Sequence, residues 1–206
     1  MITRFGVIDC EGTSFKLNNK QSLIISEISI VIFDKNKLID ALSYRLNYNL
    51  TGIQQEPYFK QLFKYLNKHF PNVYNNKLIV TNQLNPDIAR DKVLNMINNY
   101  NINDNIFAKG YRQESIWLYH PNCCDGNFDT IPKCIYKLNE LSDYNIPKYD
   151  DIDNNIKYNI IKSYINKLNN FEIEPKKIIN KIQNLKLHYS LYECLVFATL
   201  FNNISV

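Results

Sequence analysis

The residues best suited to chemistry in this sequence are two acids, Asp9 and Glu11, which follow a short apolar run near the N-terminus. The segment Phe5 to Cys10 favours a β-strand, and we expect Gly12 to Ser14 to end it. Residues two apart in a strand leave the same face, so the two carboxylates lie side by side. Carboxylates this close repel each other unless a cation lies between them. The pair therefore predicts a site for Mg²⁺ or Mn²⁺, the ions of metal-assisted phosphodiester hydrolysis, although two solvated acids would have the same spacing.

A second group of candidate residues lies near the C-terminus, where His188 precedes Glu193 by five positions. The run from Tyr189 to Phe201 predicts a helix with mostly apolar neighbours around Glu193. An acid on such an apolar face usually has a partner. A histidine has an ordinary pKa near 6.5, which suits a general base at neutral pH. The alternative is a helix-terminal histidine and a surface acid without a catalytic task.

A third candidate, Glu114, follows a short expected strand at Ile106 to Ala108 and begins a helix that runs through Trp117. A glutamate in a first helical turn also complements the helix dipole, which is the alternative explanation. Asp104 is a rival candidate, but it precedes the strand. Glu114 is the preferred middle acid.

These three groups resemble, in their order and local spacing, the DEDDh 3′–5′ exonucleases. The resemblance rests on FGVIDCEGTSF followed by IISEISIVIF, on the segment 106–118 and on the His-x4-Glu pair. It implies a mixed α/β fold with a ribonuclease-H-like sheet of about five strands flanked by helices. It also implies two Mg²⁺ or Mn²⁺ ions and a single-stranded nucleic acid with a 3′ end as substrate. The metal ligands implied are Asp9, Glu11, Glu114 and Glu193, with His188 as general base. Glutamate stands at positions 114 and 193, where aspartate is commoner in that family.

The segments 107–110 and 135–149 also resemble the Maelstrom-domain branch of this superfamily. Members of that branch often bind zinc through a Glu-Cys-His-Cys set, and many have lost the nuclease acids while still binding RNA. Two sets of side chains have approximate zinc-ligand spacing. Free cysteines are the interpretation that we favour over structural zinc. The two sets are Glu114, Cys134, His188 and Cys194, and His120, Cys123, Cys124 and Cys134.

The apolar patterning predicts strands first, then alternating helices and strands, then helices. We expect an antiparallel meander of strands at 5–10, 23–34 and 37–46, and short strands at 78–80 and 106–108. The loop at 120–130 has no apolar period. The expected helices are 59–66, 85–97, 110–117, 132–141, 154–168, 175–185 and 189–201.

Composition bounds the class of protein. The chain has 206 residues, of which 45% are apolar, so we expect a single folded domain over 1–206. No apolar run reaches the roughly 18 residues of a membrane span, and the N-terminus does not resemble a signal peptide. Five cysteines, an odd number, fit reduced thiols in the cytoplasm or nucleus. The abundance of Asn, Ile, Lys and Tyr is typical of AT-rich genomes such as those of large DNA viruses or protists.

The sequence leaves three functions open. The preferred one is an active exonuclease; the net charge of +4 is compatible with a polyanionic substrate, and 15 Tyr and 11 Phe offer rings for stacking on bases. The second is an RNA-binding module of Maelstrom type with a decayed active site. The third is a ribonuclease-H-type endonuclease, which would not need His188. Patterning alone distinguishes neither RNA from DNA nor one oligomeric state from another.

Overall fold

The computed structural model describes residues 2–17, 20–46, 84–110, 112–119, 138–173 and 189–205. Several sequence predictions lie outside these residues: the helices at 59–66 and 175–185, residues 132–137 of the helix at 132–141, the strand at 78–80, the loop at 120–130, and the positions of His188 and Cys134. The elements below are those of the described part of the chain.

The fold begins with a three-stranded antiparallel meander, as predicted. It consists of β1 (Arg4–Leu17), β2 (Lys20–Asp34) and β3 (Lys37–Arg45). The tight turn between β2 and β3 places Lys35 and Asn36 at positive φ, the backbone conformation that two-residue hairpin turns require. Central strands that are buried on both faces carry apolar runs, which explains the buried run from Ile30 to Phe33 in β2.

The prediction that β1 ends at Gly12 to Ser14 is wrong. Strand β1 runs on to Leu17, because its pairing with β2 resumes after a register shift between Glu11 and Gly12. Glu11 lies opposite Glu27 and Gly12 lies opposite Ile25, so β2 carries one extra residue at this point. Such bulges bend a strand and re-aim nearby side chains. The irregularity falls immediately beside the two N-terminal acids.

Three short parallel strands complete a mixed sheet. Strand β4 (Ile106–Ala108) pairs with β1, β5 (Asn139–Glu140) pairs with β4, and β6 (Glu172–Ile173) pairs with β3. The order of the six strands is β5-β4-β1-β2-β3-β6. The expected mixed α/β fold is therefore confirmed at this coarse level, with one strand more than the five or so predicted.

The predicted helix at 132–141 is wrong over its described part. Residues 139 and 140 form β5, and η4 (Leu141–Tyr144) is a short 3₁₀ helix. The side-chain amide of Asn139 donates to the backbone carbonyls of Asp104 (2.9 Å) and Ile106 (3.3 Å). This side-chain bonding and the pairing with β4 hold the segment extended, which an apolar pattern alone does not reveal.

Four α-helices are described: α3 (Pro86–Asn99), α4 (Arg112–Tyr119), α5 (Asn154–Leu168) and α6 (Ser190–Ser205). The side chains of Asn85 and Asp153 accept hydrogen bonds from the first backbone amides of α3 and α5, which fixes where these helices begin. The 3₁₀ helix η5 (Tyr149–Asp151) precedes α5. Within the described residues, no helix is both long and apolar enough to cross a membrane.

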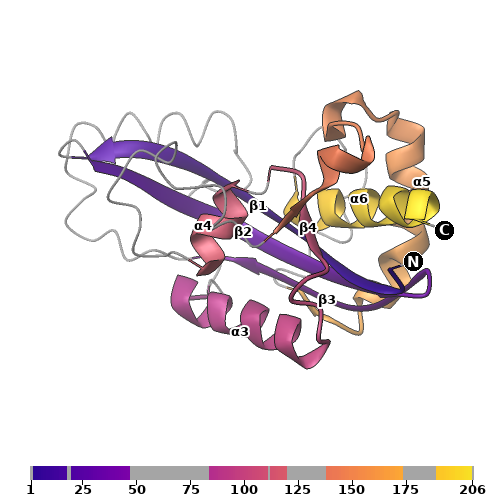
Figure 1. Ribbon diagram of the computed structural model, residues 1–206, viewed down its shortest axis with the longest axis horizontal. Coiled ribbons are helices and arrows are strands. Elements are labelled where there is room, and N and C mark those ends of the chain that lie inside the picture. Colours follow the sequence, from indigo (N-terminus) through magenta and orange to yellow (C-terminus); the bar gives the residue numbers. More distant parts are fainter. Residues whose placement is uncertain are drawn as a thin grey trace.

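The helices cover the two faces of the sheet (Figure 1). Helices α5 and α6 pack on one face, over a core that includes Phe5, Val7 and Phe33. Helices α3 and α4 pack on the other face, over Ile8 and Ile30. Alternate residues of β1 thus enter different cores, so each face can carry its own chemistry.

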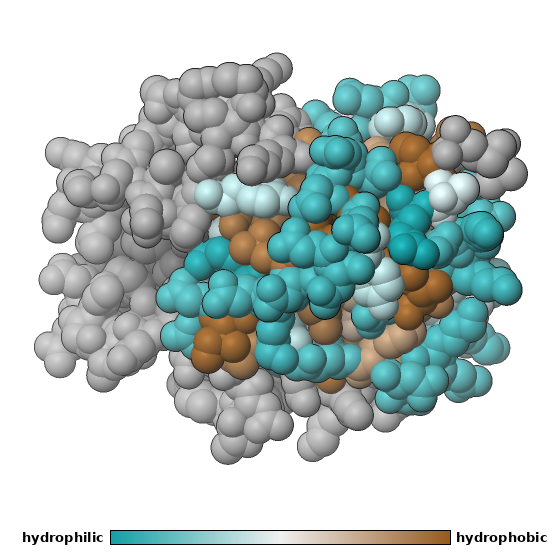
Figure 2. Space-filling model, turned by 60° about the horizontal axis from the view of Figure 1, so that its bottom comes forward, coloured by the Kyte–Doolittle hydropathy of each residue, from teal (hydrophilic) through white to brown (hydrophobic). Residues whose placement is uncertain are grey.

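The outer surface on the α3 side is mainly hydrophilic, with separate hydrophobic patches between polar side chains (Figure 2). Ile88 of α3, for example, is 51% exposed. Scattered apolar groups of this kind are normal on soluble proteins. These exposed apolar groups therefore do not by themselves indicate a functional surface.

Candidate metal centre

Three carboxylates meet beneath the start of α6. Asp9 and Glu11 come from β1 and Glu193 from the first turn of α6, and one oxygen of each lies within 4.8 Å of the other two. Asp9 and Glu193 are buried, with 8% and 7% of their surface exposed, and Glu11 is partly buried. We call Asp9, Glu11 and Glu193 the acidic trio. The two acids that the sequence paired by spacing thus meet the third from the opposite end of the chain.

The local fold explains why the trio forms. Helix α6 is apolar nearly all round, with Leu195, Val196 and Phe197 fully buried, so it lies against the sheet as a core element. Glu193 is the acid that this helix carries in its first turn, and an anion there also interacts favourably with the helix dipole. Docking α6 on β1 and β2 leaves Glu193 beside Asp9.

Asp9 lies in an electrostatically unfavourable position within the trio. Burial raises the pKa of Asp9 well above its ordinary value, and repulsion from Glu193, Glu11 and Glu114 raises it further. Among the described residues, Oδ2 of Asp9 has no hydrogen-bond partner although it is buried. A buried oxygen without a donor is costly and calls for a proton or a metal ion.

Glu114 approaches from the other side of β1. It lies on α4, is 3% exposed, and its Oε1 accepts a hydrogen bond from the Cys10 thiol at 3.4 Å. Its Oε2 is buried and, within the described part of the chain, has no hydrogen-bond partner. Burial raises the pKa of Glu114, whereas hydrogen bonds from its own backbone and from Cys10 lower it. The structure brings Glu114 near Asp9 but not into the group of described acids that meet within 4.8 Å.

The remaining site predictions are described only in part. His188 lies outside the described residues, which begin again at Tyr189, so its placement is untested. Of the possible zinc ligands, Cys194 is buried on α6 and its thiol donates to the backbone carbonyl of Ser29 at 3.4 Å. Burial raises the pKa of Cys194 well above its ordinary value, and the nearby acids add to this. The candidate ligands Cys123, Cys124, Cys134 and His120 are outside the described residues.

Two neighbours of the trio were missed by the sequence reasoning. Glu27 of β2 is buried between Arg45 and the start of α6, and Tyr149 of η5 is buried against α6. The Tyr149 ring contacts Phe197 edge-on with centroids 6.1 Å apart, and Lys157 Nζ lies 4.4 Å from its centroid. Burial raises the pKa of Tyr149, and Glu193 adds to the effect, so this phenol stays neutral beside the acids.

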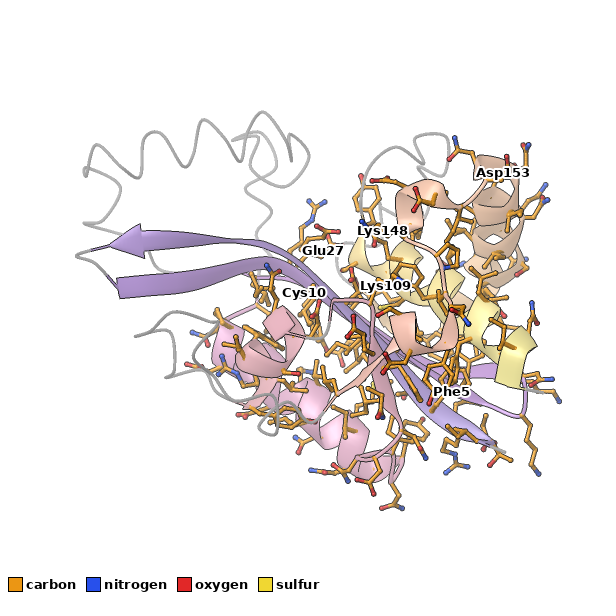
Figure 3. All side chains as sticks on the ribbon, turned by 45° about the horizontal axis from the view of Figure 1, so that its top comes forward. Phe5, Cys10, Glu27, Lys109, Lys148 and Asp153 are labelled. Atoms are coloured by element: carbon orange, nitrogen blue, oxygen red, sulfur yellow. The ribbon has the colours of Figure 1, made fainter. Side chains whose placement is uncertain are left out.

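The signals for these two residues were weak. Glu27 lies within an apolar strand, where a charged residue is rare unless it is paired, and that alone could have marked it. Tyr149 carries no comparable signal, because its proximity to Glu193 depends on how η5 packs. Figure 3 shows Cys10 and Glu27 close together midway along the long strands, with Phe5 farther along the sheet.

The donor chemistry fits a hard divalent cation. Carboxylate oxygens are the ligands that Mg²⁺ and Mn²⁺ prefer, and the trio supplies three carboxylates from two elements that the core holds rigidly. The buried Oδ2 of Asp9 is available as a ligand atom. The arrangement can therefore hold a cation and, through it, polarise a phosphate ester and activate water.

The sequence matches no protein-family model and no curated protein.

Proposed function

We propose that this protein is a metal-dependent 3′–5′ exonuclease with a ribonuclease-H-like sheet, acting on single-stranded RNA or DNA inside the cell. The observation that carries the proposal is the meeting of Asp9, Glu11 and Glu193 within 4.8 Å. Two of these acids are two residues apart on one strand, and the third comes from the first turn of a helix near the end of the chain. These are three of the four metal ligands that the family resemblance implies, and Glu114 is the fourth.

The strand order supports the proposal. An antiparallel meander is followed by β4, parallel to β1, and by β5, parallel to β4. The resemblance to ribonuclease-H-like proteins implies such a mixed sheet, with the first acids on the first strand. Strand β1, which carries Asp9 and Glu11, is flanked here by β2 and β4.

Each residue has a proposed task. Asp9, Glu11 and Glu193 would hold Mg²⁺ or Mn²⁺, and Glu114 would act beside them from the α4 side, outside the group that meets within 4.8 Å. The chemistry that two such ions would supply there is activation of a water molecule and stabilisation of the leaving oxygen of the phosphodiester. His188, five residues before Glu193, is the proposed general base that removes the proton from that water.

The direct test is a digestion of 5′-labelled oligonucleotides, RNA and DNA, single-stranded and duplex, in Mg²⁺, Mn²⁺ or EDTA. The proposal predicts progressive shortening from the 3′ end, release of mononucleotides, and complete inhibition by EDTA. Internal cleavage products would favour a ribonuclease-H-type endonuclease instead. Binding of RNA without any hydrolysis would favour the decayed RNA-binding module.

The role of His188 has its own test under single-turnover conditions. Loss of a general base typically costs about 10²- to 10⁴-fold in rate, and we expect His188→Ala to fall in that range. His69→Ala is the matched control, since the sequence gives that histidine no catalytic role. A loss of less than about tenfold in His188→Ala would remove His188 from the mechanism and leave the metal centre intact.

A further inference from the structure

Glu27 is a buried carboxylate that the proposed reaction does not use. It lies on β2, directly opposite Glu11 on β1 and Arg45 on β3, so the three side chains form a row on one face of the sheet. Glu27 is 1% exposed and Arg45 is 4% exposed. Burying a carboxylate this deeply is expensive unless its oxygens are bonded, so its contacts are informative.

The contacts of Glu27 lead to the first residue of α6. Its Oε1 accepts two hydrogen bonds from Ser190, one from the backbone amide at 2.9 Å and one from the hydroxyl at 2.8 Å. Its Oε2 lies 3.8 Å from Nε of Arg45. The first backbone amides of a helix lack partners inside the helix and are usually capped by a residue of the same segment. Here the cap comes from a strand of the sheet.

A row of hydroxyl groups strengthens the same junction. The hydroxyls of Ser190 and Ser29 are 2.6 Å apart, and those of Ser29 and Ser43 are 2.9 Å apart. One turn along α6, the Cys194 thiol donates to the carbonyl of Ser29. Glu193 lies between Ser190 and Cys194 in the chain, so both sides of its helical turn are bonded to β2.

From these contacts we propose that Glu27 is a positioning residue of the metal centre: its carboxylate bonds the start of α6 to the sheet and thereby presents Glu193 to Asp9 and Glu11. The inference rests on the proposed metal-dependent function and adds a residue to it. Because Glu27 bonds Ser190, it acts through the position of α6 and not as a ligand. The length of its side chain therefore matters more than its charge.

The length of the side chain and its charge can be separated with two variants. Glu27→Asp keeps the charge but shortens the reach by one methylene, whereas Glu27→Gln keeps the reach and an acceptor oxygen but loses the charge. Binding of Mn²⁺ to the full-length protein is measured by electron paramagnetic resonance, well below the melting temperature. We expect Glu27→Asp to weaken affinity about tenfold or more, as residues behind metal ligands typically do, and Glu27→Gln to weaken it less. Because Glu27→Gln also removes the charge that faces buried Arg45, its melting temperature is measured as well; equal or greater loss of affinity at an unchanged melting temperature would overturn the proposal.

A pair of serine variants gives an independent test that leaves both charges in place. Ser190→Ala removes one bond to Glu27, and Ser43→Ala removes a buried hydroxyl from the same row without touching Glu27. We expect Ser190→Ala to weaken Mn²⁺ binding by about fivefold, the scale of one hydrogen bond, and Ser43→Ala to leave it unchanged. This pair also decides the question if Glu27→Gln fails to fold.

The failure of this inference is distinguishable from the failure of the proposed function. If the wild-type protein binds no Mn²⁺, or binds it independently of Asp9, the metal centre itself is absent. If wild type binds Mn²⁺ through Asp9 and the Glu27 and Ser190 variants lower the melting temperature at unchanged affinity, Glu27 is a structural residue only.

Discussion

The sheet face beneath α6 has two halves built from the same strands but from opposite kinds of side chain. In one half, Phe5 of β1 stacks with Phe33 of β2 and meets Phe201 of α6, with ring centroids 5.7 and 4.9 Å apart. In the other half, positions 9 and 11 of the same strand are acids that meet Glu193 of the same helix. We call these the aromatic half and the acidic half.

The two halves affect the stability of the folded protein in opposite directions. The aromatic half gains hydrophobic and dispersion energy from every ring that it buries. In the acidic half, burial and the neighbouring carboxylates raise the pKa of Asp9, so the charged form of this side chain is unfavourable in the folded state. The rings of the aromatic half therefore stabilise the same strand and helix that carry the acids.

The largest effect expected is in the aromatic half. Phe5→Ala should lower the free energy of unfolding by about 3–5 kcal/mol, because a buried ring is replaced by a cavity. Urea denaturation of the metal-free protein measures it, with Phe5→Leu as the conservative control. A loss below about 1 kcal/mol would mean that this half does not carry the stability of the α6 junction.

A smaller effect of opposite sign is expected in the acidic half. Asp9→Asn should hold or raise the stability of the metal-free protein, because it removes a buried charge from a repulsive cluster. Asp104→Asn is the matched control, since Asp104 is exposed. Clear destabilisation in Asp9→Asn alone, measured in EDTA, would make Asp9 a structural residue and break the comparison.

The pH dependence of that stability difference sharpens the comparison. Burial, with repulsion from Glu193, raises the pKa of Asp9 in the folded state above its ordinary value of 3.8. Between pH 3.8 and the raised pKa, Asp9 is protonated in the folded state but mostly ionised in the unfolded state. The free energy of unfolding of wild type therefore falls as pH rises through this range, whereas that of Asp9→Asn lacks this contribution. Denaturation in EDTA at pH values rising from about 4 should show the stability gap between the two proteins widening. A gap that narrows with rising pH would mean that a cationic neighbour stabilises the carboxylate.

The smallest effect concerns Glu114, which approaches Asp9 from the other face of the sheet. Glu114→Gln should weaken Mn²⁺ binding by about tenfold. This loss should be smaller than the loss in Asp9→Asn, because Glu114 lies outside the trio. Cys10→Ala is the control for its hydrogen bond. Equal losses in Glu114→Gln and Asp9→Asn, measured by calorimetric titration, would place Glu114 among the direct ligands.

The sequence predicted the parts of the fold that depend on local patterning. The meander follows from β-rich runs separated by a short turn, and the helix at 154–168 was predicted with the bounds that it has. Strand β5 was missed because its conformation depends on pairing with β4, far away in the chain. The length of β1 was underestimated because the pairing beyond Gly12 is likewise a contact between strands.

The candidate site was likewise predictable only where it depends on local sequence spacing. The spacing of Asp9 and Glu11 on one strand face was visible in the sequence, whereas the approach of Glu193 was expected only through a family resemblance. Glu27 was missed because its importance depends on the register of β2 and on the docking of α6. Neither can be obtained from a single sequence by local rules.

The most direct test of the central claim is a melting curve with and without Mn²⁺. If the acidic half is a metal centre, saturating Mn²⁺ should raise the melting temperature of wild type, because a ligand that binds only the folded state stabilises that state. At a Mn²⁺ concentration 100 times its Kd, the free energy of unfolding rises by about 2.7 kcal/mol. Asp9→Asn should show no such rise, and Asp104→Asn should behave as wild type. Equal shifts in wild type and Asp9→Asn, or no shift in either, would contradict the account.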